Sequence, residues 1–457
     1  MRELKYILVF CLLSFSATVF CLVQAQDYER LGERELSGTA RYVGMGGAMT
    51  AIGGDPSAVQ DNPAGLGVYQ RAEVMLTTDF RRTSNRQQSA DPYSLRQVTV
   101  PQISVVIALP NYDYTSKIVS NNLMFSYNRL KLFTRDLSIR GNGGPSLGAL
   151  INDVELAYFV ETGKPILNID YPTDAKNVAD RFRLVESGYV NNFSVDWAMN
   201  IDNRWYVGLG LRVQNSRFSS DGDYYEYFST INPDGGVYDL QNKTSLIYSG
   251  VGFNAAVGLI YRPCQWARVG VSLQSPTVGR LNSYSSGTLS SLTDTLRYSY
   301  SPELRTSTRS YHAPLQLSVS AAAQIGQWGL IALQYNYRHG MEFQDLHSLR
   351  AGIEVVPILG LYINAGYVFE STFKPADGIV PIDPTLDRQD AYFTHMRHSQ
   401  YISGAVGYRG QHMIFQLAYQ YNWQVMNLFK HQNAPADRID TDIHKVVFSI
   451  AWHRAWP

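Results

Sequence analysis

The sequence of 457 residues has little charge and almost no cysteine. Charged residues make up 17% of it, and 39 Lys and Arg balance 39 Asp and Glu, so the formal net charge is zero. With no net positive charge and no basic stripe, the chain lacks the electrostatic footprint of a nucleic-acid-binding protein. Its three cysteines are Cys11, Cys21 and Cys264. Cys11 and Cys21 lie in the first 25 residues, which we expect to be removed as an export signal. Cys264 then remains as a single cysteine, which cannot form an internal disulfide or a cysteine-rich metal site.

Long apolar runs are also missing, except at the start of the chain. A short basic start containing Lys5 is followed by an apolar run, Tyr6–Val23, that ends just before Ala25. This order predicts an export signal over residues 1–25, cut before Gln26. An N-terminal membrane anchor is the alternative, but the basic start and the small residue at the end favour a cleaved signal. After residue 25 no run of 18 apolar residues occurs, so we expect no membrane-spanning helix.

What the sequence has in abundance is alternation of apolar and polar residues. In 412–423, Phe415, Leu417 and Tyr419 alternate with Gln416 and Gln420. Successive side chains of a strand point to opposite faces, so such a segment is a strand with one apolar and one polar face. We expect about fourteen strands, at 72–80, 100–109, 121–131, 189–201, 204–218, 246–262, 266–275, 314–326, 329–339, 347–356, 360–371, 399–409, 411–424 and 444–454.

The connections between these segments alternate in length. The short ones are Asp202–Asn203, Pro263, Gln327–Trp328, Pro357–Leu359 and Gly410, and the long ones are 81–99, 132–188, 219–245, 276–313, 372–398 and 425–443. Links 110–120 and 340–346 depart from the rhythm. Outer-membrane barrels combine tight periplasmic turns with long outer loops. A soluble β-sandwich has no reason to collect its long loops at one end. The pattern predicts an all-β fold, a transmembrane antiparallel β-barrel over residues 72–457 that crosses the outer membrane many times.

Aromatic and charged residues fit the same prediction. Aromatic residues gather at the expected strand ends, at Trp197, Trp205, Trp266, Trp328, Tyr408, Trp423 and Trp452. They match the interfacial girdles of membrane proteins, although any one of them could equally fill a core. Charges on the polar strand faces are Arg212, Arg262, Arg350, Glu354, Glu370 and Arg409, and they suit a wet or plugged lumen. We expect Glu354 and Glu370 to form ion pairs there. No nucleophile or acid–base partner beside them indicates catalysis.

Residues 26–71 do not have a strand pattern. The stretch from Gly44 to Gly67 is rich in Gly, Ala and turn residues, and its glycine spacing does not match a dinucleotide-binding fingerprint. Small residues let one backbone approach another, and Asp61–Gly65 is typical of a turn. A barrel of this size encloses more space than its own side chains fill. We therefore expect residues 26–71 to plug the lumen.

This segment resembles a known family. The residues that carry the resemblance are Gly46, Gly47, Asn62, Pro63, Ala64 and Gly65, with Arg41, Asp55 and Pro56 around them. Together they are similar to the N-terminal hatch of the FadL/TodX family of outer-membrane transporters. The resemblance is specific over about residues 36–80 and otherwise rests on strand number and loop rhythm. It implies a fourteen-stranded barrel plugged by a hatch. It also implies hydrophobic ligands that are captured outside and released sideways through the barrel wall.

One outer loop carries an apolar stripe at helical spacing. Its members, within residues 146–160, are Leu147, Leu150, Ile151, Val154 and Tyr158. A short helix that packs this stripe on the barrel rim would explain it. An exposed groove that first captures an apolar ligand is the functional alternative, and on it these five residues are the candidate ligand-binding residues.

No catalytic, metal or cofactor site is expected. His395 and His398 are three residues apart in an expected outer loop, a spacing that could serve a metal or haem, but no helical pattern or further ligand surrounds them. A solvated loop explains them equally well. No Ser/His/Asp constellation has an interpretable spacing, so we expect no enzyme activity.

Two function classes remain open from the sequence. The first is an outer-membrane channel for passive uptake of hydrophobic small molecules such as long-chain fatty acids, with outer-membrane lipid as its surroundings. The second is a barrel subunit, without transport activity, of an outer-membrane secretion complex of the type IX kind or of an assembly complex, with other outer-membrane proteins as partners. A continuous apolar path from the loops to the wall would favour the channel.

Overall fold

The computed structural model describes residues 31–86, 94–113, 115–143, 176–229, 237–292, 297–301, 304–339, 345–372, 392–430 and 435–454. Three short helices come first: α3 (Ala40–Gly44), α4 (Pro56–Asp61) and the 3-10 helix η1 (Pro63–Val68). The strands follow as β1 (Ala72–Arg86), β2 (Ser94–Pro110), β3 (Ile118–Gly141), β4 (Lys176–Ile201), β5 (Trp205–Ser229), β6 (Val237–Tyr261), β7 (Ala267–Gln274), β8 (Val278–Leu292), β9 (Arg297–Tyr300), β10 (Arg305–His312), β11 (Leu315–Ile325), β12 (Gly329–His339), β13 (Leu346–Ile358), β14 (Leu361–Thr372), β15 (Phe393–Arg409), β16 (Met413–Phe429) and β17 (Asp437–Arg454). Among these residues, no helix combines the length and apolarity needed to cross a membrane.

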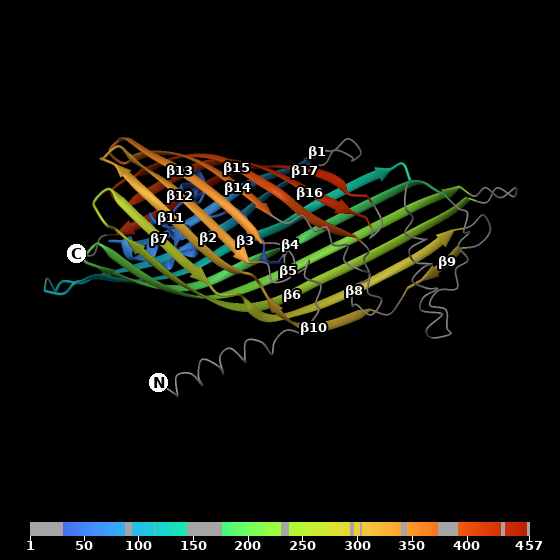
Figure 1. The fold of residues 1–457 in the computed structure, drawn as a ribbon, viewed down its shortest axis with the longest axis horizontal. Helices are drawn as coiled ribbons and strands as arrows, with labels where there is room; N and C mark the ends of the chain where they lie inside the picture. Colours follow the sequence, from blue (N-terminus) through green and yellow to red (C-terminus); the bar gives the residue numbers. More distant parts are fainter. Residues whose placement is uncertain are drawn as a thin grey trace, which may run out of the picture.

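The strands form one closed antiparallel barrel (Figure 1). Each strand pairs with its neighbour along the chain, and β17 closes the ring by pairing with β1. Strands β7 and β8 are two halves of one barrel strand, as are β10 and β11, while β9 is a short arm paired with β8. The wall therefore has fourteen strands, as the sequence predicted. Closure leaves no unpaired sheet edge to face lipid.

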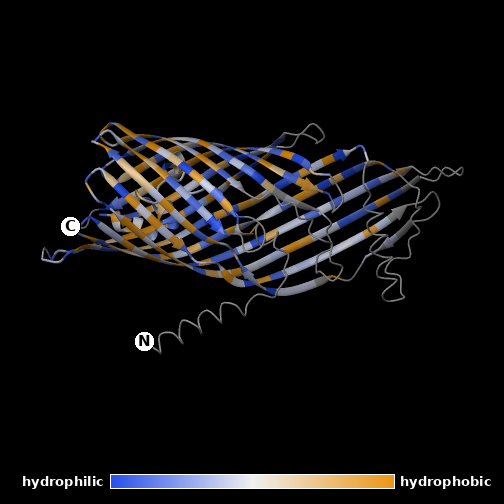
Figure 2. Ribbon diagram, in the orientation of Figure 1, coloured by the Kyte–Doolittle hydropathy of each residue, from blue (hydrophilic) through white to orange (hydrophobic). Residues whose placement is uncertain are grey.

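The predicted alternation of faces is confirmed. In β16, Phe415 and Tyr419 are about half exposed on the outside, whereas Gln416 and Gln420 are buried inside. The outer face carries many exposed apolar side chains. Figure 2 shows apolar residues, in orange, alternating with polar ones along the strands, most densely toward the end of the barrel that carries the tight turns. An exposed apolar band of this extent is stable only in hydrocarbon. Exposed aromatic residues at strand ends include Trp205, Trp266, Trp328, Tyr408 and Trp452.

The two ends of the barrel differ. One end, which we call the short-turn end, carries the tight connections and the last described residues of the chain. At one of these connections, the turn Asp202–Arg204, Asp202 and Asn203 both have φ of 54°, a left-handed conformation typical of tight hairpin turns. The opposite end carries the long loops, and we call it the long-loop end. Strands β3 to β6 are 24 to 26 residues long and extend farther toward it than β11 to β14, which are 11 to 13 residues long. One side of the wall is therefore much taller than the other (Figure 1).

This height corrects the predicted loops. The expected loops 132–188 and 219–245 lose their ends to β3, β4, β5 and β6, and two further segments are strand. Residues 276–313 were expected to be an outer loop, but β8, β9 and β10 lie within them because the wall continues past the apolar band. The segment from His395 to His398 was also expected to be a loop, but it lies in β15. In both places the strand extends beyond the lipid-facing band into water, so its outward side chains are polar. Because the alternation of apolar and polar residues is weak there, the sequence pattern did not identify these strands.

Residues 31–71, which we call the inner segment, lie inside the barrel toward the short-turn end (blue in Figure 1). Helix α3 packs against β14 to β17, and η1 packs against β3 to β6. In α4, Asp55 caps the helix by accepting a hydrogen bond from the backbone N–H of Ser57, and Pro56 takes the first position.

Candidate functional site

Two neighbouring strands of the wall are interrupted at the same height. Between β7 and β8, Ser275–Thr277 face two residues of β6 with three of their own, and between β10 and β11 the break is Ala313–Pro314. The buried side chains change from even to odd numbers between β7 and β8 and from odd to even numbers between β10 and β11, so each strand carries one extra residue. Pro276 and Pro314 cannot donate a ladder hydrogen bond. We call this pair of bulges the wall break.

A chain of polar side chains lies on the inner wall at this break. The Oγ1 of Thr277 accepts a hydrogen bond from Asn254 at 2.9 Å and donates one to Gln214 at 3.1 Å. Gln274 donates to Asn254 at 3.1 Å, and Arg212 donates to Gln274 at 2.7 Å. These bonds satisfy buried polar groups that the interrupted ladder brings to the lumen. Two backbone hydrogen bonds also remain at the break, from Ser275 to the Ala255 carbonyl oxygen at 2.8 Å and from Ala313 to the Thr277 carbonyl oxygen at 2.9 Å. The break is therefore held by side chains together with a reduced backbone ladder.

The start of the inner segment covers the wall break from inside. Leu31 is almost fully buried in a cluster with Ala313, and Gly32 lies against Pro314 so closely that a Cβ would come within 2.7 Å of the Cδ of the proline. The remaining cavity, lined by Leu31, Gly32, Thr277 and Pro314 among others, measures about 10 Å³. That is at the lower limit for one water molecule. The break is closed in this structure.

An apolar cluster lines the lumen just beyond the break toward the long-loop end. We call it the mid-lumen cluster; its members are Leu31, Phe133, Val190, Phe218, Leu246, Tyr248, Leu281, Tyr311 and Ala313. Rings of Phe133 and Phe218 meet edge to face with centroids 5.0 Å apart. Because Ala313 belongs to both the cluster and the break, apolar surface reaches the wall at this height.

A second apolar cluster fills the barrel at the long-loop end. This mouth cluster consists of Leu137, Ile139, Phe182, Leu184, Tyr224, Phe228, Leu240, Leu289, Tyr392, Met426, Leu428 and Ile439. Tyr392, from the chain before β15, packs on Phe182 with ring centroids 5.4 Å apart and hydrogen-bonds to Ser220. The cluster joins the tall wall to the tips of β16 and β17.

A polar belt separates the two clusters. It contains Arg135, Glu186, Ser220 and Thr244, which occupy the inward positions between mouth and mid-lumen. Arg135 and Glu186 form an ion pair at 2.7 Å, and Glu186 is buried. The apolar surface of the lumen is therefore interrupted, and a ligand that moved from one cluster to the other would pass polar side chains.

Buried charges join the inner segment to the wall. Arg41 of α3 holds Glu354 of β13 with two hydrogen bonds, Nε to Oε2 at 2.6 Å and Nη2 to Oε1 at 2.9 Å. Arg350 donates to Asp61 at 3.1 Å and to the Tyr42 hydroxyl at 3.0 Å. The predicted lumen ion pair of Glu354 is confirmed, and the partner of Glu354 is Arg41 of the inner segment. Glu370 lies within 3.6 to 3.8 Å of Arg338 and Arg350.

Glu35 is the centre of a second group of charges. Its carboxylate pairs with Arg81 at 2.7 Å, Lys445 at 3.3 Å and Lys131 at 3.6 Å. Burial alone would raise the pKa of Glu35, but the charges of Arg81, Lys445 and Lys131 outweigh it and hold the pKa well below its ordinary value. Lys131 also pairs with Glu33 at 2.7 Å. Three wall strands, β1, β3 and β17, thus hold the inner segment through one carboxylate.

The turn at Asn62 is built for close contact with the wall. Asn62 caps η1 by accepting a hydrogen bond from Ala64 at 3.0 Å and donates to the carbonyl oxygen of Thr50 at 2.9 Å. The wall carries glycine where it meets this turn, because a Cβ at Gly208 would overlap the backbone of Pro63 and Ala64. Similar contacts occur at Gly258, Gly270, Gly352 and Gly366, each of which lies against inner-segment atoms.

The glycines of the predicted hatch have two roles. Gly46 and Gly47 adopt φ of 61° and 69°, a left-handed conformation that other residues rarely adopt. Gly46 also lies against the backbone of Tyr367 in β14. Gly65 packs on Gly53, where a Cβ would come within 3.0 Å of its Cα. A larger residue at Gly46 or Gly47 would press on the wall, whereas one at Gly65 would push apart two parts of the inner segment.

The candidate ligand-binding residues Leu147, Leu150, Ile151, Val154 and Tyr158 lie outside the described residues. Within the described chain, no group of three or more His, Cys, Asp or Glu side chains could hold a metal ion. The wall break and the apolar clusters were not predicted. Pro276 and Pro314 were a usable signal for the break, but the alternation of apolar and polar residues stops near them, so they were interpreted as the ends of strands. The inward aromatic residues of the tall wall gave no signal, because their outward neighbours are polar too.

Known proteins resemble this chain in fold. No protein-family model and no curated protein sequence matches it. A crystal structure of a Pseudomonas aeruginosa FadL homologue aligns over 93% of this chain and 100% of that one, with 11% identity and a TM-score of 0.52. The Ralstonia pickettii toluene transporter TbuX aligns over 91% and 98%, with 14% identity and a TM-score of 0.51. The Pseudomonas putida toluene transporter TodX aligns over 92% of this chain and 99% of its own, with 12% identity and a TM-score of 0.50. The predicted FadL/TodX-type fold is confirmed.

Proposed function

We propose that this protein is an outer-membrane channel for passive uptake of hydrophobic small molecules, such as long-chain fatty acids. The ligand enters at the long-loop end, rests against the mid-lumen cluster and leaves sideways through the wall break into the membrane. One observation carries the proposal: the mid-lumen cluster and the break share Ala313, so apolar surface leads to the place where two adjacent strands lose regular pairing.

The inner segment acts as the hatch of this channel. It blocks the straight route to the short-turn end, because buried ion pairs and close backbone contacts bind it to the wall on several sides. A sideways exit then needs a smaller movement than removal of the whole segment. It requires Leu31 and Gly32 to move away from Ala313 and Pro314, and the hydrogen bonds of Ala313 and Thr277 at the break to open. The fold similarity to TbuX and TodX, which are described as toluene transporters, supports the same class of cargo.

The route can be mapped with a photoreactive long-chain fatty acid that carries a diazirine on its chain. Cells that produce the protein would be given the probe and irradiated, and labelled peptides would be identified by mass spectrometry. We expect label at residues of the mid-lumen cluster and the break, including Leu281, Tyr311 and Ala313, and we expect an excess of unlabelled fatty acid to suppress it. Label restricted to the outer face of the barrel would contradict the route.

A second candidate is a subunit of an outer-membrane complex that does not itself transport. The polar belt favours it, because Arg135 and Glu186 interrupt the apolar path. A polar hollow of about 460 Å³ beside Arg183, Asp223 and Lys243 on the tall wall also offers a partner surface. Purification in mild detergent separates the two: stoichiometric co-purification of another protein supports the subunit, and bound lipid or fatty acid without such a protein supports the channel.

A further inference from the structure

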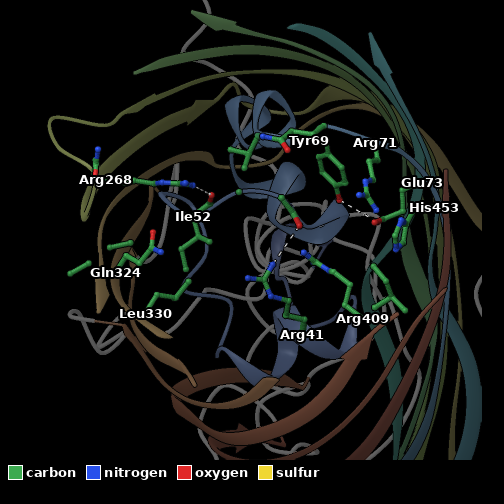
Figure 3. A pocket seen from close by; sticks show the side chains of 18 of the residues that line it. Arg41, Ile52, Tyr69, Arg71, Glu73, Arg268, Gln324, Leu330, Arg409 and His453 are labelled. Carbon is green, nitrogen blue, oxygen red and sulfur yellow. Dashed lines mark hydrogen bonds between the residues drawn. The ribbon is translucent and has the colours of Figure 1, made fainter. Parts of the chain in front are cut away.

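A cavity of about 490 Å³ opens under the inner segment at the short-turn end (Figure 3). Its walls come from the inner segment, including Ile52 and Tyr69, and from the ends of strands on several sides of the barrel. The volume lies within the range of small-ligand sites, roughly 300–1,000 Å³. It lies on the opposite side of the inner segment from the mid-lumen cluster, so it is separate from the proposed route.

Positive charge dominates this cavity. Arg71, Arg268 and Arg409 line it, and within the described chain none of the three takes part in an ion pair. Arg268 donates a hydrogen bond to the carbonyl oxygen of Ile52 at 2.9 Å. The single carboxylate in the lining is Glu73, which accepts a hydrogen bond from Tyr69 at 3.4 Å. Three guanidinium groups against one carboxylate leave a positive excess that an anionic group would balance.

Arg41 also lines the cavity, but its charge is already used. It forms the bidentate pair with Glu354, and its Nη1 is 3.4 Å from the carbonyl oxygen of Gly54. Figure 3 shows Arg71 and Arg409 on the side of Glu73 and His453, and Arg268 across the cavity from them. The unpaired guanidinium groups therefore approach the cavity from two sides.

Part of the remaining lining is apolar. Its apolar members are Ile52, Val68, Trp266, Ala322, Ala323, Leu330 and Ile414, while Gln70, Gln265, Gln324 and His453 contribute neutral polar groups. Ala322 faces inward from β11, next to the outward-facing Ala321. A ligand that fits both halves of the lining combines an anionic group with a short apolar part.

We propose that this cavity binds the head of a single-chain anionic amphiphile, a carboxylate or a phosphate monoester, with the first part of its chain against the apolar lining. Arg71 and Arg409 bind the head group, and Arg268 reaches it from the opposite wall. The site is independent of the proposed uptake route, since the inner segment separates the two.

Binding can be measured by equilibrium dialysis of the purified protein in amphipol against radiolabelled laurate, dodecyl phosphate and dodecanol. We expect laurate or dodecyl phosphate to bind with one molar equivalent that an Arg71→Gln/Arg409→Gln variant weakens at least about tenfold, equal to 1.4 kcal/mol. The anion that binds more tightly identifies the source of the head group. Equal binding of dodecanol, or binding of both anions that the double variant does not change, would overturn the proposal.

Matched variants separate the site from general effects. Arg204→Gln removes an exposed arginine of the Asp202–Arg204 turn at the same end of the barrel, outside the cavity, and we expect it to leave binding unchanged. Ala322→Phe fills the apolar part of the cavity and should weaken binding, whereas Ala321→Phe on the outer face should not. Heat-modifiable migration in gels verifies that each variant forms a folded barrel. Equal loss with Arg204→Gln, or equal loss with both phenylalanine variants, would contradict a specific site.

Discussion

In the half of the lumen toward the short turns, the inner segment is fixed to the wall by buried ion pairs and by glycines that let backbones touch. In the half toward the long loops, two apolar clusters face each other across a polar belt, and the described ion pairs there, such as Arg135–Glu186 and Lys430–Asp180, join parts of the wall to one another rather than to the inner segment. Buried charges are costly to separate, whereas apolar contacts can be exchanged for contacts with an apolar ligand. The comparison indicates that the inner segment is a fixed seal toward the short-turn end. Toward the long-loop end, it indicates a compartment whose apolar contacts can be exchanged for a ligand.

The largest effect is expected in the seal, at Arg41 and Glu354. Glu354→Gln leaves a buried guanidinium without its carboxylate, and removing one partner of such a pair costs about 3–5 kcal/mol. We expect the variant to expose the inner segment to proteolysis at a lower urea concentration than the wild type. The measurement is limited trypsin digestion of the barrel in detergent across a urea series.

Two further variants test the reason for this effect. Glu370→Gln removes a carboxylate whose arginine contacts are longer, 3.6 and 3.8 Å, and should change the urea midpoint less. Arg41→Met/Glu354→Met removes both charges and should recover most of the lost stability. If the double variant is as sensitive as Glu354→Gln, an unpaired buried charge is not the cause.

A smaller effect is expected from the close contacts of the seal. Gly208→Ala adds a Cβ against the backbone of Pro63 and Ala64, and overpacking of this kind costs about 1–3 kcal/mol. Gly404→Ala is the matched control, since its nearest neighbour, the Asn364 carbonyl oxygen, would be 3.6 Å away. Thermal unfolding followed by circular dichroism should show a lower midpoint for the first variant alone. Equal midpoints would show that the wall at β5 can yield.

The contacts that Glu35 makes in the seal should resist mild acid. Because the folded-state pKa of Glu35 is depressed, its contribution to stability is present above its ordinary pKa, near 4.5, and is lost as pH falls through the folded value. Single-channel conductance in planar bilayers should therefore show no opening of the short-turn end between pH 7 and pH 5. Glu35→Gln should open it more often at every pH in that range. Opening of the wild type near pH 6 would contradict the assignment.

The smallest effect is expected at the long-loop end, on residues that the structure does not describe. Leu150→Asp/Ile151→Asp should lower uptake of a labelled fatty acid by a few-fold without preventing barrel insertion, if this stripe first captures the ligand. Unchanged uptake would leave the stripe as a structural element of the rim. The mouth cluster would then be the first apolar contact for the ligand.

The sequence predicted the barrel well because the membrane imposes a strict pattern. Each lipid-facing residue must be apolar, so the alternation in segments such as 412–423 identified the strands and their faces directly. The charges of Glu354 and Glu370 identified the lumen for the same reason. Above the apolar band this constraint ends, and β8 and β10 could not be distinguished from a loop.

The candidate site was harder to predict because it depends on neighbours far apart in sequence. In the sequence, Pro276 and Pro314 indicate only the ends of two strands. Only the pairing of these strands in the structure shows that the two positions are adjacent and form one break in the wall. Gly208 and Gly366 likewise read as weak strand residues until the inner segment is seen against them. Arg41 could not be assigned to Glu354 because 312 positions lie between them and no local pattern links the two.

The central claim is sideways release through the wall break, and a reversible disulfide tests it most directly. A Cβ on Gly32 would lie 3.9 Å from the Cβ of Ala313, within the range of a disulfide, roughly 3.5–4.5 Å. In a Cys264→Ser background, Gly32→Cys/Ala313→Cys should take up fatty acid when reduced and lose uptake when oxidised. Each single-cysteine variant controls for the new side chain and should not respond to oxidation. Equal uptake by the oxidised and reduced double variant would contradict release through the break.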